Sequence, residues 1–182
     1  IGLIAQARRK SADAEKSLVE ALRIDPGNMQ ALKALAQEFK RNHKYKDALT
    51  YFTTNKGLSQ KDPEVMIGIV TSLLGLERKD EAMKRLEQGI AAFPEDPRFA
   101  FHLARIHAQQ GHLQFAQSNY EKAIAADPDF HRAYVAQALL TVESMGASPA
   151  ERSKGEADAR ALLKSAEDRG ATRDAEVAVE LG

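Results

Sequence analysis

The chain has 182 residues, of which 43% are hydrophobic, and this is enough to build a sizeable buried core. It carries 26 basic and 26 acidic residues, so no net charge draws the whole chain to nucleic acid or to an acidic membrane. The absence of cysteine excludes a disulfide scaffold and thiolate-based sites, and no apolar run approaches the roughly 20 residues of a membrane span. We therefore expect a folded protein without nucleic-acid binding and without direct membrane insertion.

The sequence repeats itself with a 34-residue period. Each copy holds a small residue, then a large apolar residue four positions later, then another small residue three positions further on. The first two of these columns are Ala14, Ala48, Ala82, Ala116 and Leu18, Phe52, Leu86, Tyr120. The third column departs from the pattern at Asn55. Because several columns agree in phase, the pattern indicates a repeat architecture rather than a chance excess of alanine.

Within each copy the apolar residues follow helical spacing. Leu32, Leu35 and Phe39 fit one helix, and Ala48 and Phe52 fit a second one. Short polar stretches such as "RNHKY", "LERKD" and "QQGHL" separate the two helices, and Asp-Pro or Phe-Pro ends the second helix. Each copy is therefore predicted to be a pair of helices.

A two-helix unit with this 34-residue pattern resembles the tetratricopeptide repeat (TPR) family, over residues 1 to about 145 with a weaker continuation. The resemblance implies an all-α fold, a right-handed superhelix (α-solenoid) of antiparallel helix pairs. The whole chain is then one array, with a partial copy, three full copies, an irregular copy with an insertion of about nine residues, and the start of a further helix. Their ranges are 1–28, then 29–62, 63–96 and 97–130, then 131–171, and last 172–182. Leu181-Gly182 echoes Ile1-Gly2, so we expect a segment of a longer array.

The irregular copy contains its own helix-start signal. Ser148, Pro149 and Glu151 read as an N-cap, a first-turn proline and a capping-box acid. The small–large–small pattern then continues at Ala159, Leu163 and Ala166.

In the TPR family the first helices line a concave groove, which implies a binding surface on the stripe opposite the core positions. Its predicted residues are Lys33, Gln37, Lys40, Glu64, Ile67, Thr71, Arg98, Phe101, His102, Arg105, Arg132, Val135 and Leu139. Within this set, Ile67, Phe101 and Val135 form an apolar strip flanked by arginines, which suggests a surface that a partner covers. The alternative is that these three apolar residues pack against a neighbouring repeat.

The predicted function is a protein–protein interaction scaffold that binds a peptide or helix of a partner, apolar with acidic groups, in its groove. The alternative is a regulatory or substrate-recruiting module of a larger enzyme or of a secretion or assembly protein. Homo-oligomerisation stays open. Some family members grip a C-terminal carboxylate with Lys and Asn residues, and the comparable positions here are Lys33, Gln37, Gly68, Arg98 and His102. Gly68 cannot supply an amide and Gln37 is one methylene too long, which argues against that co-chaperone role.

The sequence predicts no enzyme, no cofactor and no metal site. The five histidines lack a pair at a spacing of four with a carboxylate partner, and no glycine-rich phosphate loop or nucleophile elbow occurs. His102 is expected at the surface beside the groove. His107 stands at an apolar repeat position, so we expect it to be partly buried and hydrogen-bonded.

Overall fold

The structure of the chain is a computed structural model that describes residues 2–54 and 62–170, except for the side chains of residues 2–9, 11, 40 and 54. The predicted helix at 172–182 and Asn55, where the repeat pattern is broken, lie outside the described residues.

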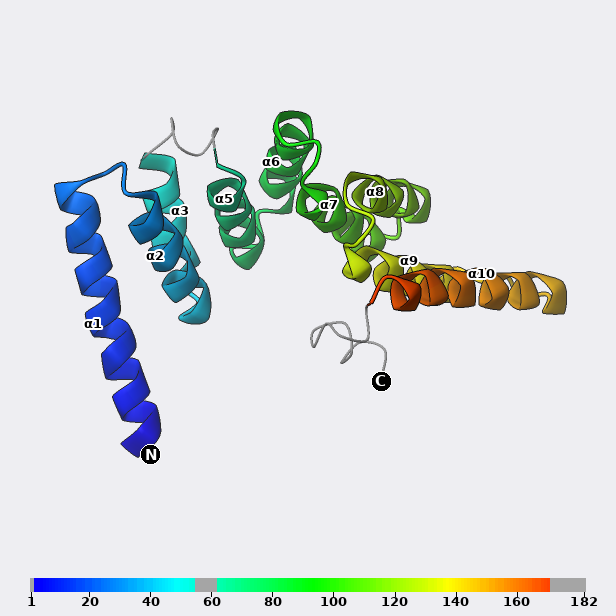
Figure 1. Cartoon of the computed structure of the whole chain (residues 1–182), viewed down its shortest axis with the longest axis horizontal. Coiled ribbons are helices and arrows are strands. Elements are labelled where there is room, and N and C mark those ends of the chain that lie inside the picture. The colour runs from blue at the N-terminus through cyan, green and yellow to red at the C-terminus, as the bar shows by residue number, and fades with distance from the viewer. Residues whose placement is uncertain (1, 55–61, 171–182) are drawn as a thin grey trace. The chain divides into compact units, whose positions relative to one another are not determined.

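The described residues form helices and connecting turns, with no strand among them. The helices are α1 (Gly2–Ile24), α2 (Met29–Arg41), α3 (Tyr45–Thr54), α5 (Pro63–Gly75), α6 (Lys79–Ala92), α7 (Pro97–Gln109), α8 (Leu113–Ala126), α9 (His131–Glu143) and α10 (Pro149–Asp168) (Figure 1). Four of them, α2, α5, α7 and α9, begin at the same position of successive copies, at Met29, Pro63, Pro97 and His131. The sequence period is therefore also the period of the helix starts.

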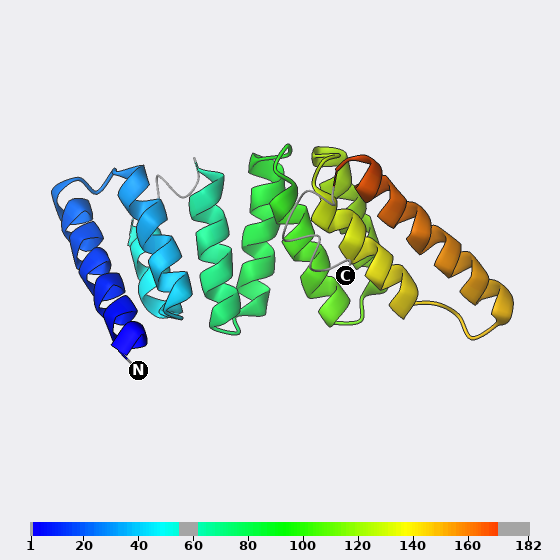
Figure 2. The same ribbon diagram turned by 60° about the horizontal axis from the view of Figure 1, so that its bottom comes forward.

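The chain divides into two compact units, Ile1–Ala92 and Phe93–Gly182. In the first unit α1 packs on α2, α2 on α3, α3 on α5 and α5 on α6. In the second unit α7 packs on α8, α8 on α9 and α9 on α10. Figure 2 shows the helices of each hairpin, such as α9 and α10, running in opposite directions beside one another. Each unit is thus a series of helix pairs in which neighbours along the chain are neighbours in space.

The small and large repeat columns form the contacts between helices. Ala82, Leu86 and Ala116 are 0% exposed, and Phe52 and Tyr120 are also buried. Alanine at the helix crossing lets two backbones approach closely, and the large neighbour fills the space beside it. The same column is exposed at one place, Ala14 of α1.

Two glycines of α5 receive aromatic rings from α3. The ring of Phe52 lies on Gly68, and the ring of Tyr45 lies on Gly75. The two rings and the two glycines each lie two turns apart on their own helix. A Cβ atom at either glycine would overlap the ring, which explains why these helical positions lack a side chain.

Side-chain caps recur at the helix starts. Asn28 accepts a hydrogen bond from the backbone N–H of Ala31, at the start of α2. Asp62 accepts from the N–H of Glu64, and Asp96 from the N–H of Arg98. These caps satisfy backbone donors that a helix cannot satisfy itself. The next position in this column, at the start of α9, is Phe130, which gives no side-chain cap.

The turns between paired helices also share one conformation. His43, Glu77 and Gly111 have φ angles of 55°, 58° and 75°. They occupy the same position in three successive copies, so the left-handed residue of the turn is a fixed feature of the repeat. Only Gly111 adopts it without steric cost.

The predicted helix start at Ser148 is confirmed. The Ser148 side chain accepts from the N–H of Glu151, while the Glu151 carboxylate accepts from the Ser148 backbone, which completes the capping box. These bonds hold the pKa of Glu151 below its usual value. The predicted packing of α10 is confirmed as well, since Ala159 and Ala166 are buried and Leu163 is partly buried.

Candidate protein-binding surface

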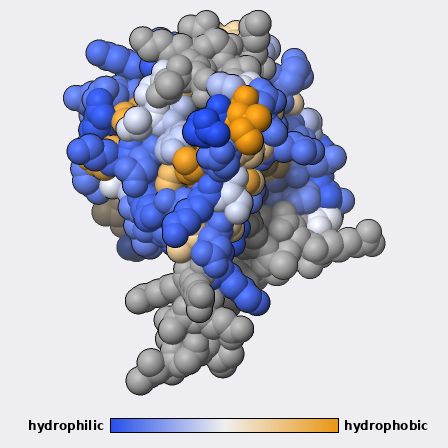
Figure 3. Space-filling model, turned by 90° about the vertical axis from the view of Figure 1, so that its left-hand side faces the viewer, coloured by the Kyte–Doolittle hydropathy of each residue, from blue (hydrophilic) through white to orange (hydrophobic). Residues whose placement is uncertain are grey.

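In the first unit, the predicted surface residues are mostly polar. Lys33 forms an ion pair with the α5 cap, Nζ to Asp62 Oδ2 at 3.0 Å. Gln37 and Glu64 are exposed, whereas Ile67 and Thr71 are half-buried. The side chain of Lys40 lies outside the described residues. The face shown in Figure 3, where α1 lies, is mainly hydrophilic with small separate hydrophobic spots.

In the second unit, the prediction of an exposed apolar strip is wrong at two positions. Phe101 is only 5% exposed and contacts Tyr120 and Phe130, with ring centroids 5.8 and 5.2 Å apart. Val135 is 1% exposed and belongs to a cluster with Ala166 of α10. Both side chains are buried because the partner helix of each pair packs over them, α8 over Phe101 and α10 over Val135. Packing within the repeat array therefore accounts for Phe101 and Val135.

Arg98 is held by its own helix cap. Its Nη2 lies 2.6 Å from Asp96 Oδ2 and its Nε 2.9 Å from Asp96 Oδ1, a two-pronged contact. The Asp96 carboxylate thus compensates the charge of Arg98 while it also caps α7. In the first unit, Lys33 is paired with Asp62 and Gly68 is covered by the ring of Phe52.

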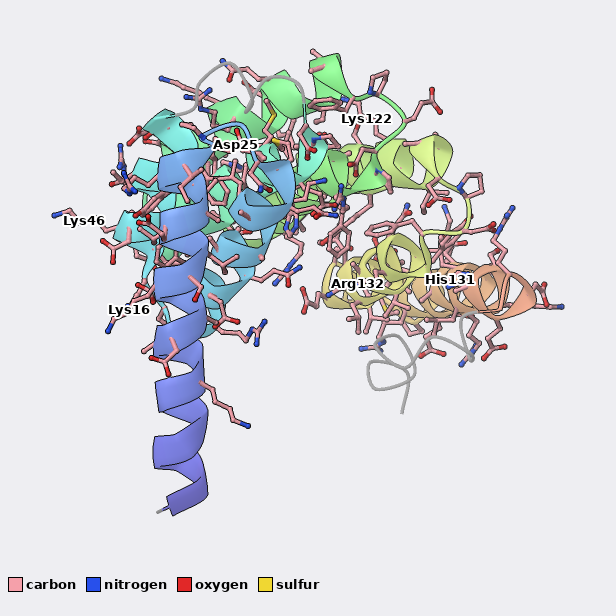
Figure 4. The ribbon with its side chains drawn as sticks, turned by 60° about the vertical axis from the view of Figure 1, so that its left-hand side comes forward. Lys16, Asp25, Lys46, Lys122, His131 and Arg132 are labelled. Carbon is pink, nitrogen blue, oxygen red and sulfur yellow. The ribbon has the colours of Figure 1, made fainter. Side chains whose placement is uncertain are left out.

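Arg105 of α7 and Arg132 of α9 meet at one aromatic ring. Their guanidinium carbons lie 5.9 and 5.7 Å from the centroid of Phe101. Arg105 is exposed, and no described carboxylate forms an ion pair with it. Figure 4 labels Arg132 next to His131 at the start of α9, and His131 is bonded through Nε2 to the carbonyl oxygen of Arg169 beyond α10. Two cations therefore lie at one buried ring, and the exposed Arg105 is in a position to attract an anion.

Tyr120 of α8 contacts the same Phe101 ring. Burial raises the pKa of its hydroxyl, and Glu143 adds to this rise while Arg105 opposes it. The phenol therefore stays protonated at neutral pH, and Arg105 and Glu143 are both within electrostatic reach of it.

The exposed apolar side chains of α9 lie further along the helix. Leu139 is 55% exposed and Val142 is 50% exposed. Leu139 follows Arg132 by two helical turns, which places both on the same face of α9, roughly 10 Å apart along the helix axis. Leu139 was among the predicted site residues, whereas Val142 was missed, although it stands on the same stripe. Arg105, Arg132, Leu139 and Val142 are called the α7–α9 surface below.

His102 is half-buried beside the ring of Phe101, at a centroid distance of 5.7 Å. His107 is partly buried, as predicted, and its ring lies 5.4 Å from that of Phe115. Phe115 is 63% exposed at the start of α8, an apolar spot that the repeat pattern did not indicate.

The described residues contain no group of three His, Cys, Asp or Glu side chains arranged to hold a metal ion. Among the helices described here, none combines the length and apolar character that crossing a membrane requires.

The helix pairs and their 34-residue period define a helical-repeat protein. Residues 67–116 match the family model described as tetratricopeptide repeat. This segment of the chain is similar to the TPR family.

Two curated relatives and two solved structures illustrate this similarity. The chain is 25% identical over 118 residues to TPR repeat-containing protein YpiA of Bacillus subtilis, covering 65% of this chain and 28% of YpiA. It is 27% identical over 133 residues to cellulose synthase operon protein C of Pseudomonas fluorescens, covering 69% of this chain and 10% of that protein. The chain thus spans only a minor part of these relatives.

The solved structure of MamA is similar with a TM-score of 0.69 and 20% identity, over 95% of this chain and 96% of MamA. YrrB, described as a TPR protein with an unusual peptide-binding site, is similar with a TM-score of 0.60 and 17% identity, over 98% of this chain and 86% of YrrB. The predicted all-α helical-repeat fold of the TPR type is confirmed.

Proposed function

We propose that the chain binds a peptide or helical segment of a partner protein on the α7–α9 surface, and so acts as a scaffold in a complex. The observation that carries this proposal is the pairing of two chemistries on one surface. Arg105 and Arg132 supply positive charge at the ring of Phe101, and Leu139 and Val142 supply exposed apolar area on α9.

The chemistry of the segment follows from this surface. Carboxylates of the segment would bind the exposed guanidinium group of Arg105, because a charge-assisted hydrogen bond to arginine is stronger than a neutral one. Leu, Ile or Val side chains of the segment would cover Leu139 and Val142, since burial of apolar area drives association. Lys33, Gln37, Lys40, Glu64, Ile67 and Thr71 of the first unit stay predicted contacts of the same partner or of a second segment.

The scaffold role places no catalytic step on this chain. TPR modules bind through side chains on their helices, and the α7–α9 surface offers cations and aliphatic groups without a paired acid and base. We therefore propose a non-enzymatic role for these residues.

A second candidate is a recruiting or regulatory module within a larger protein. It is favoured by the length of the relatives, because the chain spans 28% of YpiA and 10% of cellulose synthase operon protein C. In that role the same surface would bind a segment of the larger assembly.

The test uses a random dodecapeptide library displayed on phage and selected on the purified chain. We expect Asp and Glu to be enriched together with Leu, Ile and Val. One enriched acidic peptide is then synthesised with a fluorescent label, and its Kd is measured by fluorescence polarisation. Arg105→Glu should weaken binding by about tenfold or more, because it removes an attraction and adds a repulsion.

Leu139→Asp should weaken the binding of the same peptide by a similar factor. Lys122→Glu is the matched control, with the same change of charge at an exposed position on α8 (Figure 4). It should change the Kd by less than about twofold, since exposed charges at a distance are screened. A selected pool without acidic enrichment, or equal losses for Arg105→Glu and Lys122→Glu, would refute the proposal.

A further inference from the structure

The last turn of α9 carries a carboxylate that the helix itself does not favour. Glu143 is the final residue of α9, and this last turn contains no basic residue. The C-terminal end of a helix carries a partial negative charge, so a negative side chain there is repelled. Glu143 is exposed, and no described cation forms an ion pair with it. The stability of α9 therefore does not account for an acid at this position.

Glu143 shares a face of α9 with an exposed apolar residue. It follows Leu139 by four positions, and residues four apart are neighbours on the surface of a helix. Leu139 is 55% exposed, and Val142, which precedes Glu143, is 50% exposed. The carboxylate therefore borders the exposed apolar part of the α7–α9 surface, about 6 Å from Leu139 along the helix axis.

The exposed cation of the same surface lies on the neighbouring first helix. Leu139 stands 34 residues after Arg105, so the two residues occupy the same position of successive first helices. Burial raises the pKa of the Tyr120 hydroxyl, while Arg105 lowers it and Glu143 raises it. Arg105 and Glu143 are therefore both within electrostatic reach of one phenol, and no ion pair joins them in the described part of the chain.

We propose that Glu143 is a specificity-determining residue of the α7–α9 surface and binds a Lys or Arg side chain of the partner segment. The segment then places an acidic residue at Arg105, an aliphatic residue at Leu139 and a basic residue at Glu143. Because the cation and the carboxylate lie on different helices, the order of charges in the segment fixes its direction across α7 and α9. This inference rests on the proposed function and adds to it a basic residue and an orientation.

The spacing of the aliphatic and basic residues in the segment follows from α9. A separation of about 6 Å corresponds to residues three or four positions apart in a helical segment, or two positions apart in an extended one. The dodecapeptides selected on the purified chain should therefore contain Lys or Arg at one of these spacings from Leu, Ile or Val, in addition to Asp or Glu.

The binding test compares one selected peptide with a charge-exchanged version, in which one acidic and one basic residue trade places. The two peptides have the same composition and net charge, so the ratio of their Kd values, measured by fluorescence polarisation, reports orientation alone. For the wild-type chain we expect the selected peptide to bind about tenfold more tightly or better. Glu143→Gln should weaken the selected peptide by about threefold, as expected for an exposed ion pair. The double variant Arg105→Glu/Glu143→Arg should prefer the exchanged peptide.

Two controls separate binding from folding. Glu121→Gln makes the same change of carboxylate to amide at an exposed position of α8, and it should alter the Kd by less than about 1.5-fold. Glu143→Gln should leave the thermal unfolding midpoint unchanged or raise it, because it removes a negative charge from the C-terminal end of α9. A lower midpoint together with equal losses for both peptides would assign Glu143 a structural role and overturn the inference.

The remaining outcomes distinguish the two proposals. A selected pool without acidic enrichment refutes the proposed function. An acidic pool without Lys or Arg, a wild-type ratio near one, or an unchanged Kd for Glu143→Gln overturns the role of Glu143 and leaves the proposed function intact. If the double variant does not fold by circular dichroism, the comparison of Glu143→Gln with Glu121→Gln decides, and equal Kd values for these two variants overturn the inference.

Discussion

The residue with a positive φ angle in the helix–helix turn allows a direct test of how backbone strain affects the stability of the repeat. His43, Glu77 and Gly111 occupy the same turn position with positive φ angles, but only one of them is glycine. We predict that Glu77→Gly stabilises the chain and that Gly111→Ala destabilises it.

The magnitude follows from the backbone alone at Gly111. A Cβ atom at this position would meet no atom within 4 Å, so steric overlap with neighbours makes no contribution. A residue with a Cβ in the left-handed region costs about 1–2 kcal/mol. The entropy that glycine loses on folding offsets roughly 0.5–1 kcal/mol of this. The net effect is about 0.5–1 kcal/mol, unfavourable for Gly111→Ala and favourable for Glu77→Gly.

The assay is thermal and urea unfolding followed by circular dichroism in the far ultraviolet. For a chain of this size, about 1 kcal/mol corresponds to a Tm change of roughly 2–4 °C. Because repeat arrays unfold in parts, the two variants are compared through the transition midpoint of each unfolding step. His43→Gly serves as an internal comparison, since its gain is reduced by loss of the 2.9 Å hydrogen bond between His43 Nδ1 and the Tyr45 hydroxyl. If Glu77→Gly lowers the midpoint, the reasoning fails.

Three further predictions concern the capping box, the buried ring and the glycine contact. Glu151 has a folded pKa below the usual carboxyl value of 4.5, so its contribution to stability is present above that value and is lost as pH falls through the folded pKa. The stability difference between wild type and Glu151→Gln, measured by urea unfolding, should therefore be larger at about pH 6 than at about pH 3, and a constant difference would contradict this. Phe101→Ala should lower the free energy of unfolding by about 3–5 kcal/mol, because the ring is buried and has five aromatic or cationic neighbours. An unchanged unfolding midpoint would mean that the ring is not part of the core. Gly68→Ala should destabilise by about 1–3 kcal/mol despite the better helix propensity of alanine, because the buried Phe52 ring cannot move away; a stabilised variant would show that it can.

The sequence predicted much of the fold because the same pattern occurs in several copies, which supports each helix assignment more strongly than one copy would. A single Ala or Pro is weak evidence, but the same residue type at one position of four successive copies indicates a common structural role. The first helices of the copies begin at that period, and the capping box at Ser148 and the partly buried His107 were also predicted. These features depend on residues close in sequence, whose spacing alone determines the local geometry.

The candidate site was predicted less well. Helical spacing within each first helix placed Phe101 and Arg105 on the stripe that faces away from the core. The same spacing placed Val135 and Leu139 on the corresponding stripe of the next first helix. In the structure Phe101 is 5% exposed and Leu139 is 55% exposed. The first helices α2, α5 and α9 each contact their own partner and also a helix of the preceding repeat, α1, α3 and α8 in turn. More of their circumference is therefore buried than a helix with one buried face would have.

The sequence by itself therefore determined the repeat, the helix pairs and the helix starts, because these follow from period, caps and prolines. Only the tertiary structure decided which stripe residues are covered and which charges are compensated. The Asp96 carboxylate binds Arg98 two positions after it, whereas the guanidinium group of Arg132 lies over the ring of Phe101. Burial and charge pairing arise between helices, and a pattern read along one helix does not contain them.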